Sequence, residues 1–221
     1  DTPCSAYGVY VQDSLAYVAD YEGGLIILRY TGSVPDTTPP SAVTDLVASN
    51  PTPDSITLTW TAPGDDIDVG TASQYDIRYA TSPITEDSWG GAKECQGEPM
   101  PQVAGGAETF TVTNISPSTT YYFAIKSADE ALNWSEISNL ASKYTLANTP
   151  SAPTVSNPTS TKLDVDVNPN GNPANTLFAI YNETGKYYVD ANGGNNGEDP
   201  FWRTDSDWGK VTVENLEPDT E

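Results

Sequence analysis

Three aspartates in one short stretch carry the clearest potential chemistry of this sequence. Asp65, Asp66 and Asp68 follow Pro63-Gly64 closely. Carboxylate oxygens are the ligands that Ca²⁺ prefers, and the ion takes about six to eight of them. The spacing of an EF-hand, with its terminal glutamate, is missing, so an acidic solvated loop is the alternative interpretation. The Gly/Asn-rich stretch 190–199 carries the same two interpretations. Calcium is the one cofactor to which the sequence points.

The residue types that most enzymes use for proton transfer or nucleophilic attack are scarce. The chain contains no histidine, which excludes His-dependent triads and His metal ligands. Its two cysteines, Cys4 and Cys95, are too few for a Cys-rich zinc site. A glycosidase needs only two carboxylates, but nothing in the sequence selects such a pair. We therefore expect a protein that is not an enzyme.

The same two cysteines lie far apart in the sequence, in different predicted units. In an oxidising exterior, a disulfide between Cys4 and Cys95 would join the two units rigidly. Two free or intermolecular thiols are the alternative, and the separation of the two Cα atoms would decide between them.

Several side chains could contact a ligand or carry a modification. Trp89, Trp202 and Trp208 fall in predicted loops, where they either stack on sugars and anchor partners or cap the core. Three triplets fit the acceptor pattern for N-linked glycans, a short pattern that also arises by chance: Asn114-Ile115-Ser116, Asn133-Trp134-Ser135 and Asn182-Glu183-Thr184.

The charge of the chain restricts its partners. Its net charge is -22, from 9 Lys+Arg against 31 Asp+Glu. Nucleic acid and anionic membranes attract basic surfaces, so neither is an expected partner. No apolar run approaches the ~18 residues of a membrane helix, and no signal peptide is recognisable. We expect no membrane insertion in this segment.

The sequence predicts that the candidate site residues are positioned by β-strands and the turns between them. Turn-forming residues recur throughout, and apolar residues alternate strictly in 55–60 and 74–79. The stretch 114–127 begins as a turn at Pro117 and Thr119 and continues as a strand from Tyr121. A tyrosine placed in this way is typical of the tyrosine corner of a β-sandwich. The sequence predicts an all-β protein.

Residues 1–32 predict three short strands joined by tight turns, at 8–11, 15–20 and 25–30. With Ala6-Tyr7-Gly8-Val9-Tyr10-Val11 and Ala16-Tyr17-Val18-Ala19-Asp20, this β-meander resembles one blade of an LVIVD-type β-propeller repeat. A propeller needs several blades, so the resemblance implies further blades upstream. The alternative is a short meander that packs on the next domain. Residues 33–41 are a Pro-rich linker.

Residues 42–146 resemble a fibronectin type III domain over its full length. The resemblance is carried by Trp60, by Tyr75-x-Ile77-x-Tyr79 and by the corner Ile115-x-Pro117-x-Thr119-x-Tyr121-x-Phe123. The stretches 60–66 and 128–135 look like the variant of large secreted prokaryotic proteins. Membership implies an immunoglobulin-like sandwich and a binding, spacing or adhesive role, without naming a ligand.

Residues 147–221 predict a second domain of the same type. Leu216-x-Pro218-x-Thr220 repeats the spacing of the first corner, and the sequence reaches Glu221 before the corner tyrosine. We expect this domain to lack its last two strands here. Either they follow in a longer chain, or a strand of another chain completes the sheet.

These observations favour a non-catalytic structural or adhesive segment of a larger secreted or cell-surface protein, such as part of a filament. Its expected partners are proteins or glycans at the cell surface, or further copies that associate by strand addition. An accessory region of a secreted hydrolase, binding carbohydrate or acting as a spacer, is the alternative.

Overall fold

The computed structural model describes residues 6–12, 15–20, 24–29 and 35–217. The chain forms two compact units, Asp1–Thr37 and Thr38–Glu221. Within the described residues, helical structure is confined to the 3₁₀ turn η1 (Trp89–Gly91) and the single-turn helix α1 (Asp205–Trp208). The prediction of an all-β protein is confirmed.

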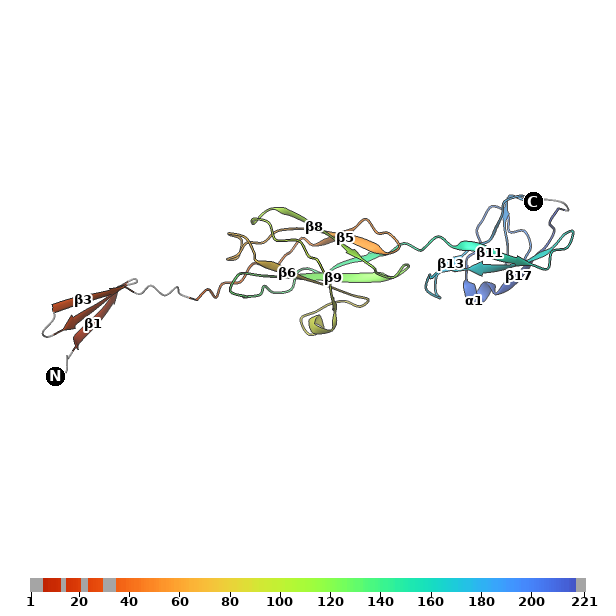
Figure 1. Cartoon of the computed structure of the whole chain (residues 1–221). Coiled ribbons are helices and arrows are strands. Elements are labelled where there is room, and N and C mark those ends of the chain that lie inside the picture. The colour runs from red at the N-terminus through yellow and green to blue at the C-terminus, as the bar shows by residue number, and fades with distance from the viewer. Residues whose placement is uncertain (1–5, 13–14, 21–23, 30–34, 218–221) are drawn as a thin grey trace. The chain divides into compact units, whose positions relative to one another are not determined.

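The first unit contains the predicted three-stranded meander. Its antiparallel strands are β1 (Ala6–Gln12), β2 (Leu15–Asp20) and β3 (Gly24–Arg29), in that spatial order (Figure 1, red). Among the side chains described, Val9, Tyr10 and Ile27 are more than half exposed. A small sheet of this kind cannot cover both of its apolar faces by itself.

The stretch 42–146 forms a sandwich of two antiparallel sheets (Figure 1, orange to green). One sheet has the order β4-β5-β8, with strands Val47–Ser49, Ser55–Thr61 and Ala107–Thr113. The other has the order β10-β9-β6-β7, with strands Ala141–Tyr144, Thr120–Ala128, Gln74–Ala80 and Lys93–Glu94. The predicted alternation sets the core, because every second residue of β5 and β6 is buried.

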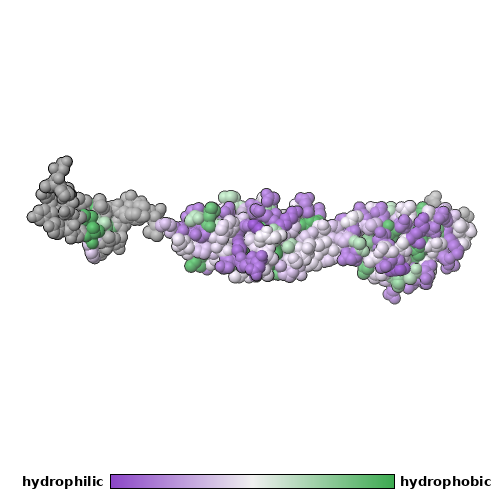
Figure 2. Space-filling model, turned by 90° about the horizontal axis from the view of Figure 1, so that it is seen from below, coloured by the Kyte–Doolittle hydropathy of each residue, from purple (hydrophilic) through white to green (hydrophobic). Residues whose placement is uncertain are grey.

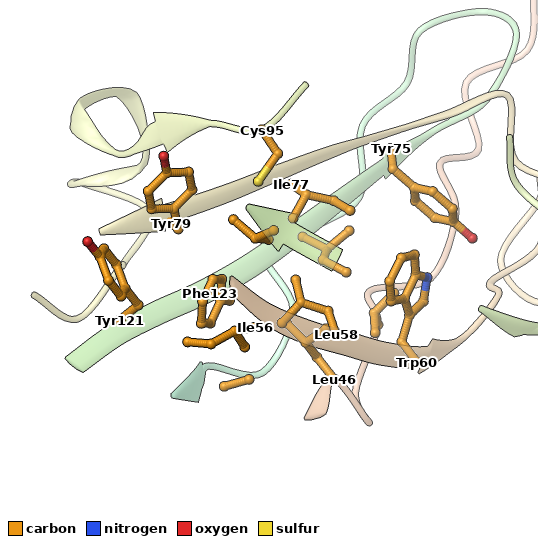
Figure 3. Packing of buried hydrophobic residues seen from close by; sticks show 14 of the residues in the cluster. Leu46, Ile56, Leu58, Trp60, Tyr75, Ile77, Tyr79, Cys95, Tyr121 and Phe123 are labelled. Atoms are coloured by element: carbon orange, nitrogen blue, oxygen red, sulfur yellow. The ribbon is translucent and has the colours of Figure 1, made fainter. Parts of the chain in front are cut away.

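The centre of this core is built from β5, β6 and β9 (Figure 3). Ile56, Leu58, Ile77, Phe123 and Ile125 are fully buried. Trp60 packs edge-on against Tyr75, with ring centroids 5.2 Å apart, and closes one end of the core (Figure 3). Such aromatic pairs add stability beyond the area that they bury.

The corner before β9 has the predicted tyrosine geometry. The Tyr121 ring is buried, and its hydroxyl oxygen accepts a hydrogen bond from the Ser116 amide at 2.9 Å. The Thr119 hydroxyl donates to the Pro117 carbonyl at 2.8 Å, and Asn114 begins the turn with a φ of 59°. These bonds satisfy backbone groups where the chain crosses from one sheet to the other.

The predicted Pro-rich linker is anchored at its end. The Ile67 amide donates to the Pro39 carbonyl at 3.2 Å, and the Ser41 amide donates to the Ile67 carbonyl at 2.9 Å. The last residues of the linker therefore pair with the loop that carries the three aspartates.

Residues 147–217 contain a second hydrophobic cluster and several short sheets (Figure 1, cyan to blue). A three-stranded sheet has the order β11-β12-β17, with strands Ser151–Ser156, Leu163–Asn168 and Lys210–Val213. Two shorter pairs are β13 (Leu177–Phe178) with β16 (Arg203–Thr204), and β14 (Tyr181–Asn182) with β15 (Tyr187–Tyr188).

The sheet β11-β12-β17 has the same strand order and pairing as the sheet β4-β5-β8, whereas membership of residues 147–221 in a second domain of the predicted type stays a prediction. Ile56 pairs with Val112 in the first sheet, and Leu163 pairs with Val213 in the second. The turn before the central strand is the same, since the Thr52 amide donates to Ser55 and the Thr159 amide to Lys162.

The corner after the last strand of each sheet also begins in the same way. Asn114 and Asn215 both have a φ of 59°. The next amide then bonds back across the sheet, from Ile115 to Asp54 and from Leu216 to Thr161. The predicted later part of the second corner, at Pro218 and Thr220, lies outside the described residues.

Candidate functional site

The aspartate-rich loop between β5 and β6 is a tight turn. The Asp65 amide donates to the Val69 carbonyl at 2.6 Å, and the Val69 amide donates to the Asp66 carbonyl at 3.1 Å. Gly70 follows with a φ of 84°, a conformation that suits glycine. This geometry holds the Asp65 side chain in place and leaves Asp66 and Asp68 exposed.

Asp65 faces acidic residues of another loop. Burial, and then a hydrogen bond with the Glu130 carboxyl, raise the pKa of Asp65, and the charges of Glu130, Asp66 and Asp129 act in the same direction. One carboxyl oxygen of Asp65 is buried without a hydrogen-bond partner. The structure thus brings Asp65 next to Glu130 rather than to Asp68.

Asp129 has a different role in the same loop. It is fully buried and accepts bonds from the Asn133 amide at 2.8 Å and from Asn133 Nδ2 at 2.7 Å. Burial alone would raise the pKa of Asp129, but these bonds lower it. The Asp129 carboxylate therefore fixes the turn that presents Glu130.

Sequence reasoning did not connect these two loops. In the sequence, the stretch 128–135 carries only a family resemblance, and the pairing of its acidic residues with Asp65 depends on the folded sandwich. Across the described residues, no three His, Cys, Asp or Glu side chains form a group that could hold a metal ion. Calcium binding at Asp65, Asp66 and Asp68 stays a prediction.

Trp89 lies on the outer side of the sheet that contains β6 and β9. Arg78 from β6 and Lys126 from β9 lie 5.0 and 5.3 Å from the centre of its ring. Arg78 also donates to the Trp89 carbonyl at 3.1 Å, and Glu86 bonds Lys126 at 2.7 Å. The long loop after β6 is thus fastened over the sheet through cation–π contacts and an ion pair.

The other two candidate tryptophans occupy opposite environments. Trp208 is buried in the second cluster, where its indole nitrogen donates to the Phe178 carbonyl at 2.9 Å. This core position leaves Trp208 no open ring face for a sugar. Trp202 is 57% exposed, so it is the one of the three that offers its ring mainly to solvent.

Cys95 is buried within the first hydrophobic core and has no disulfide partner among the described residues (Figure 3). Burial, followed by nearby acidic charge, raises the pKa of the Cys95 thiol to about 12. Its predicted disulfide partner, Cys4, lies outside the described residues, so the pairing stays a prediction.

A groove of about 220 Å³ opens on the second cluster. Its apolar lining comes from three consecutive segments: Pro150, Pro153, Val165, Val167, Phe178 and Ile180. No pattern in the sequence predicts this groove. The expected lack of two strands predicts only that the core of this region is incomplete.

The family model described as Fibronectin type III domain matches residues 41–142. The chain is 35% identical over 147 residues to "Calcium-activated chloride channel regulator 1" of Mus musculus, a match covering 60% of this chain and 16% of that protein. It is 39% identical over 127 residues to "Calcium-activated chloride channel regulator 4" of Homo sapiens, covering 54% and 14%. The chain therefore spans only a small part of these relatives' length.

Among solved structures, a two-domain fibronectin type III segment of chicken tenascin aligns with a TM-score of 0.48 and 16% identity. That alignment covers 81% of this chain and 85% of the tenascin segment.

The comparisons support neither the propeller-repeat resemblance of residues 1–32 nor the predicted prokaryotic source, since the relatives named above are mouse and human proteins. They do support the central prediction. With two packed antiparallel sheets, the tyrosine corner and the family match in agreement, residues 41–142 are a fibronectin type III domain.

Proposed function

We propose that this chain is a non-catalytic structural or adhesive segment of a larger extracellular or cell-surface protein. The observation that carries the proposal is the repetition of one half-sandwich and the start of its corner within a single chain. Tandem sandwich modules serve well as spacers and as platforms for partners, because each module presents its loops and edges on a rigid scaffold.

The surface supports a role in a polar exterior. Hydrophilic residues cover much of the face seen in Figure 2, with apolar residues in small patches between them. The net charge of -22 keeps such a chain soluble and discourages non-specific association. Among the described residues, no helix is long and apolar enough to cross a membrane. Proteins or glycans of the cell surface are the proposed partners.

The relatives suggest the kind of protein to which the segment belongs. Their names describe regulators of calcium-activated chloride channels. A module within a regulator of this kind fits the proposal.

An antibody against residues 42–146 tests the proposed location. We expect it to label intact cells of the source organism, or to detect the protein in their medium. Labelling that requires permeabilised cells, with none in the medium, would contradict an extracellular role.

The alternative, carbohydrate binding in a secreted hydrolase, now rests on Trp202, whose ring is mostly exposed. A glycan array can compare the protein with its Trp202→Ala variant, using Trp89→Ala as the matched control. Binding that is lost only in Trp202→Ala would favour this alternative. Absence of binding by the unmodified protein would remove it.

A further inference from the structure

Three loops at one end of the fibronectin type III domain carry exposed apolar side chains. One loop follows β5, the second precedes β8 and the third follows β9. The Ala104 amide donates to the Gly70 carbonyl at 3.0 Å, which joins the first two loops. The Ser73 amide donates to the Ala128 carbonyl at 2.7 Å, which joins the first to the third. The large apolar side chains that are at least 40% exposed in these loops are Ile67, Val69, Val103, Leu132 and Trp134.

The other end of the same sandwich lacks such side chains. Its turns, 50–54 and 114–119, contain no large exposed apolar residue. The apolar residues are therefore concentrated at one end of the domain. Exposed apolar residues gathered in this way are typical of interaction surfaces.

Two of these residues have a backbone conformation that their side chains disfavour. The φ angle is 60° at Ile67 and 66° at Leu132. Large apolar residues, and β-branched ones above all, are rare in this left-handed region, whereas asparagine tolerates it. Among the described residues, seven other non-glycine positions have a positive φ, and five of them are asparagines. Apolar side chains kept in a strained conformation and exposed to solvent indicate a functional surface.

The loops hold both strained residues in fixed positions. The Ile67 amide donates to the Pro39 carbonyl at 3.2 Å, and the Ile67 carbonyl accepts from the Gly64 amide at 3.1 Å. The Leu132 amide donates to the Asp129 carbonyl at 3.3 Å. Because the two side chains are positioned before a partner arrives, binding costs them little conformational entropy.

Exposed carboxylates accompany the apolar side chains. Asp66 and Asp68 flank Ile67, and Glu130 lies two residues before Leu132. Within the described part of the chain, none of these three carboxylates forms an ion pair with a lysine or arginine. A partner that brings cations would therefore match the charge of this end of the domain.

We propose that these five apolar residues and three carboxylates, the loop surface, form a docking site for a protein segment that presents apolar side chains next to lysine or arginine. This inference names the partner class of the proposed adhesive segment and in that respect rests on the proposed function. Its test uses purified protein, so its failure would leave the antibody test of location unaffected.

A displayed library of random peptides, selected on the immobilised 221-residue chain, supplies the probe. We expect the enriched peptides to combine apolar residues with lysine or arginine. The most enriched peptide is then synthesised, and its affinity is measured by calorimetry. Failure to enrich any peptide, or enrichment of peptides without basic residues, would overturn the proposal.

Two substitutions separate binding from folding. Ile67→Asn and Leu132→Asn each remove an apolar side chain and suit the left-handed backbone. We expect each to weaken peptide binding about tenfold and to leave the domain at least as stable. The control is Tyr144→Asn, because Tyr144 is 52% exposed and pairs with Thr120 at the far end of β9. Unchanged binding by Leu132→Asn, or lower stability of both loop variants, would overturn the proposal.

The carboxylates are tested by a double variant. Asp66→Asn combined with Asp68→Asn should weaken binding about threefold and reduce its dependence on salt. An unchanged salt dependence would contradict the role of these charges. Binding of the chain to phosphatidylcholine vesicles, lost in Leu132→Asn, would overturn the protein partner and assign the loop surface to a membrane.

Discussion

The fibronectin type III domain and residues 147–217 share one sheet and differ in the other. Both build a three-stranded sheet of the same order, with the same turn before its central strand. Only the first domain adds a continuous four-stranded sheet and thereby buries Ile56, Leu58 and Trp60 from both sides. The comparison teaches that a sheet of this order can form without a continuous four-stranded sheet opposite it, whereas full burial of its apolar face requires one.

The largest expected effect concerns Cys95. Because its pKa is raised to about 12, roughly a thousandfold less thiolate is present than for an ordinary cysteine at mildly alkaline pH. In a Cys4→Ser background, iodoacetamide should label Cys95 only when the first domain unfolds. The labelling rate should therefore follow the opening of this domain and should not respond to unfolding of residues 147–217. Rapid labelling of the folded protein would contradict the closed core that distinguishes the first domain from residues 147–217.

The next largest effect is expected for Phe123→Ala. This residue is fully buried, and truncation of a core phenylalanine costs about 3–5 kcal/mol of stability. Phe178→Ala in the second cluster should cost less, because Phe178 borders the open groove. Denaturant unfolding of both variants measures the difference. Equal losses would show that the two cores are equally packed.

A smaller loss is expected for Tyr121→Phe, which removes the acceptor for the Ser116 amide. The cost of one such hydrogen bond is about 1 kcal/mol. Tyr144→Phe serves as the control, because Tyr144 is 52% exposed. A Tyr121→Phe variant as stable as the control would show that the hydrogen bond at the corner does not stabilise the first domain.

The smallest effect is expected for Asp65→Asn. Because the folded pKa of Asp65 is raised, the folded state holds this proton more tightly than the unfolded state does. The resulting stabilisation is present below the unfolded pKa and is lost as pH rises through the folded pKa. The variant should therefore be slightly more stable than the unmodified protein at neutral pH and should lose this pH dependence. Thermal unfolding from pH 3 to 8 checks both points; a less stable variant at neutral pH would contradict the repulsion from Glu130.

Much of this fold follows from the sequence, because alternation in β5 and β6 and the corner at Tyr121 are local patterns. The environment of Trp208 does not, since its indole bonds to Phe178 from a distant segment. The same holds for Asp65 and Glu130, which meet only after two loops are placed by the sandwich. Trp89 illustrates a third case: its loop position was predicted, but its contacts with Arg78 and Lys126 require the finished sheet.

The central claim is that residues 147–217 repeat the three-stranded sheet of the first domain but leave part of its apolar face uncovered. Residue-resolved hydrogen exchange of the 221-residue chain tests it most directly. We predict slow exchange for β5, β6 and β9, intermediate exchange for β12, and fast exchange for 177–182 beside the groove. Protection of 177–182 equal to that of β6 would contradict the claim, because it would mean that the second core is already closed.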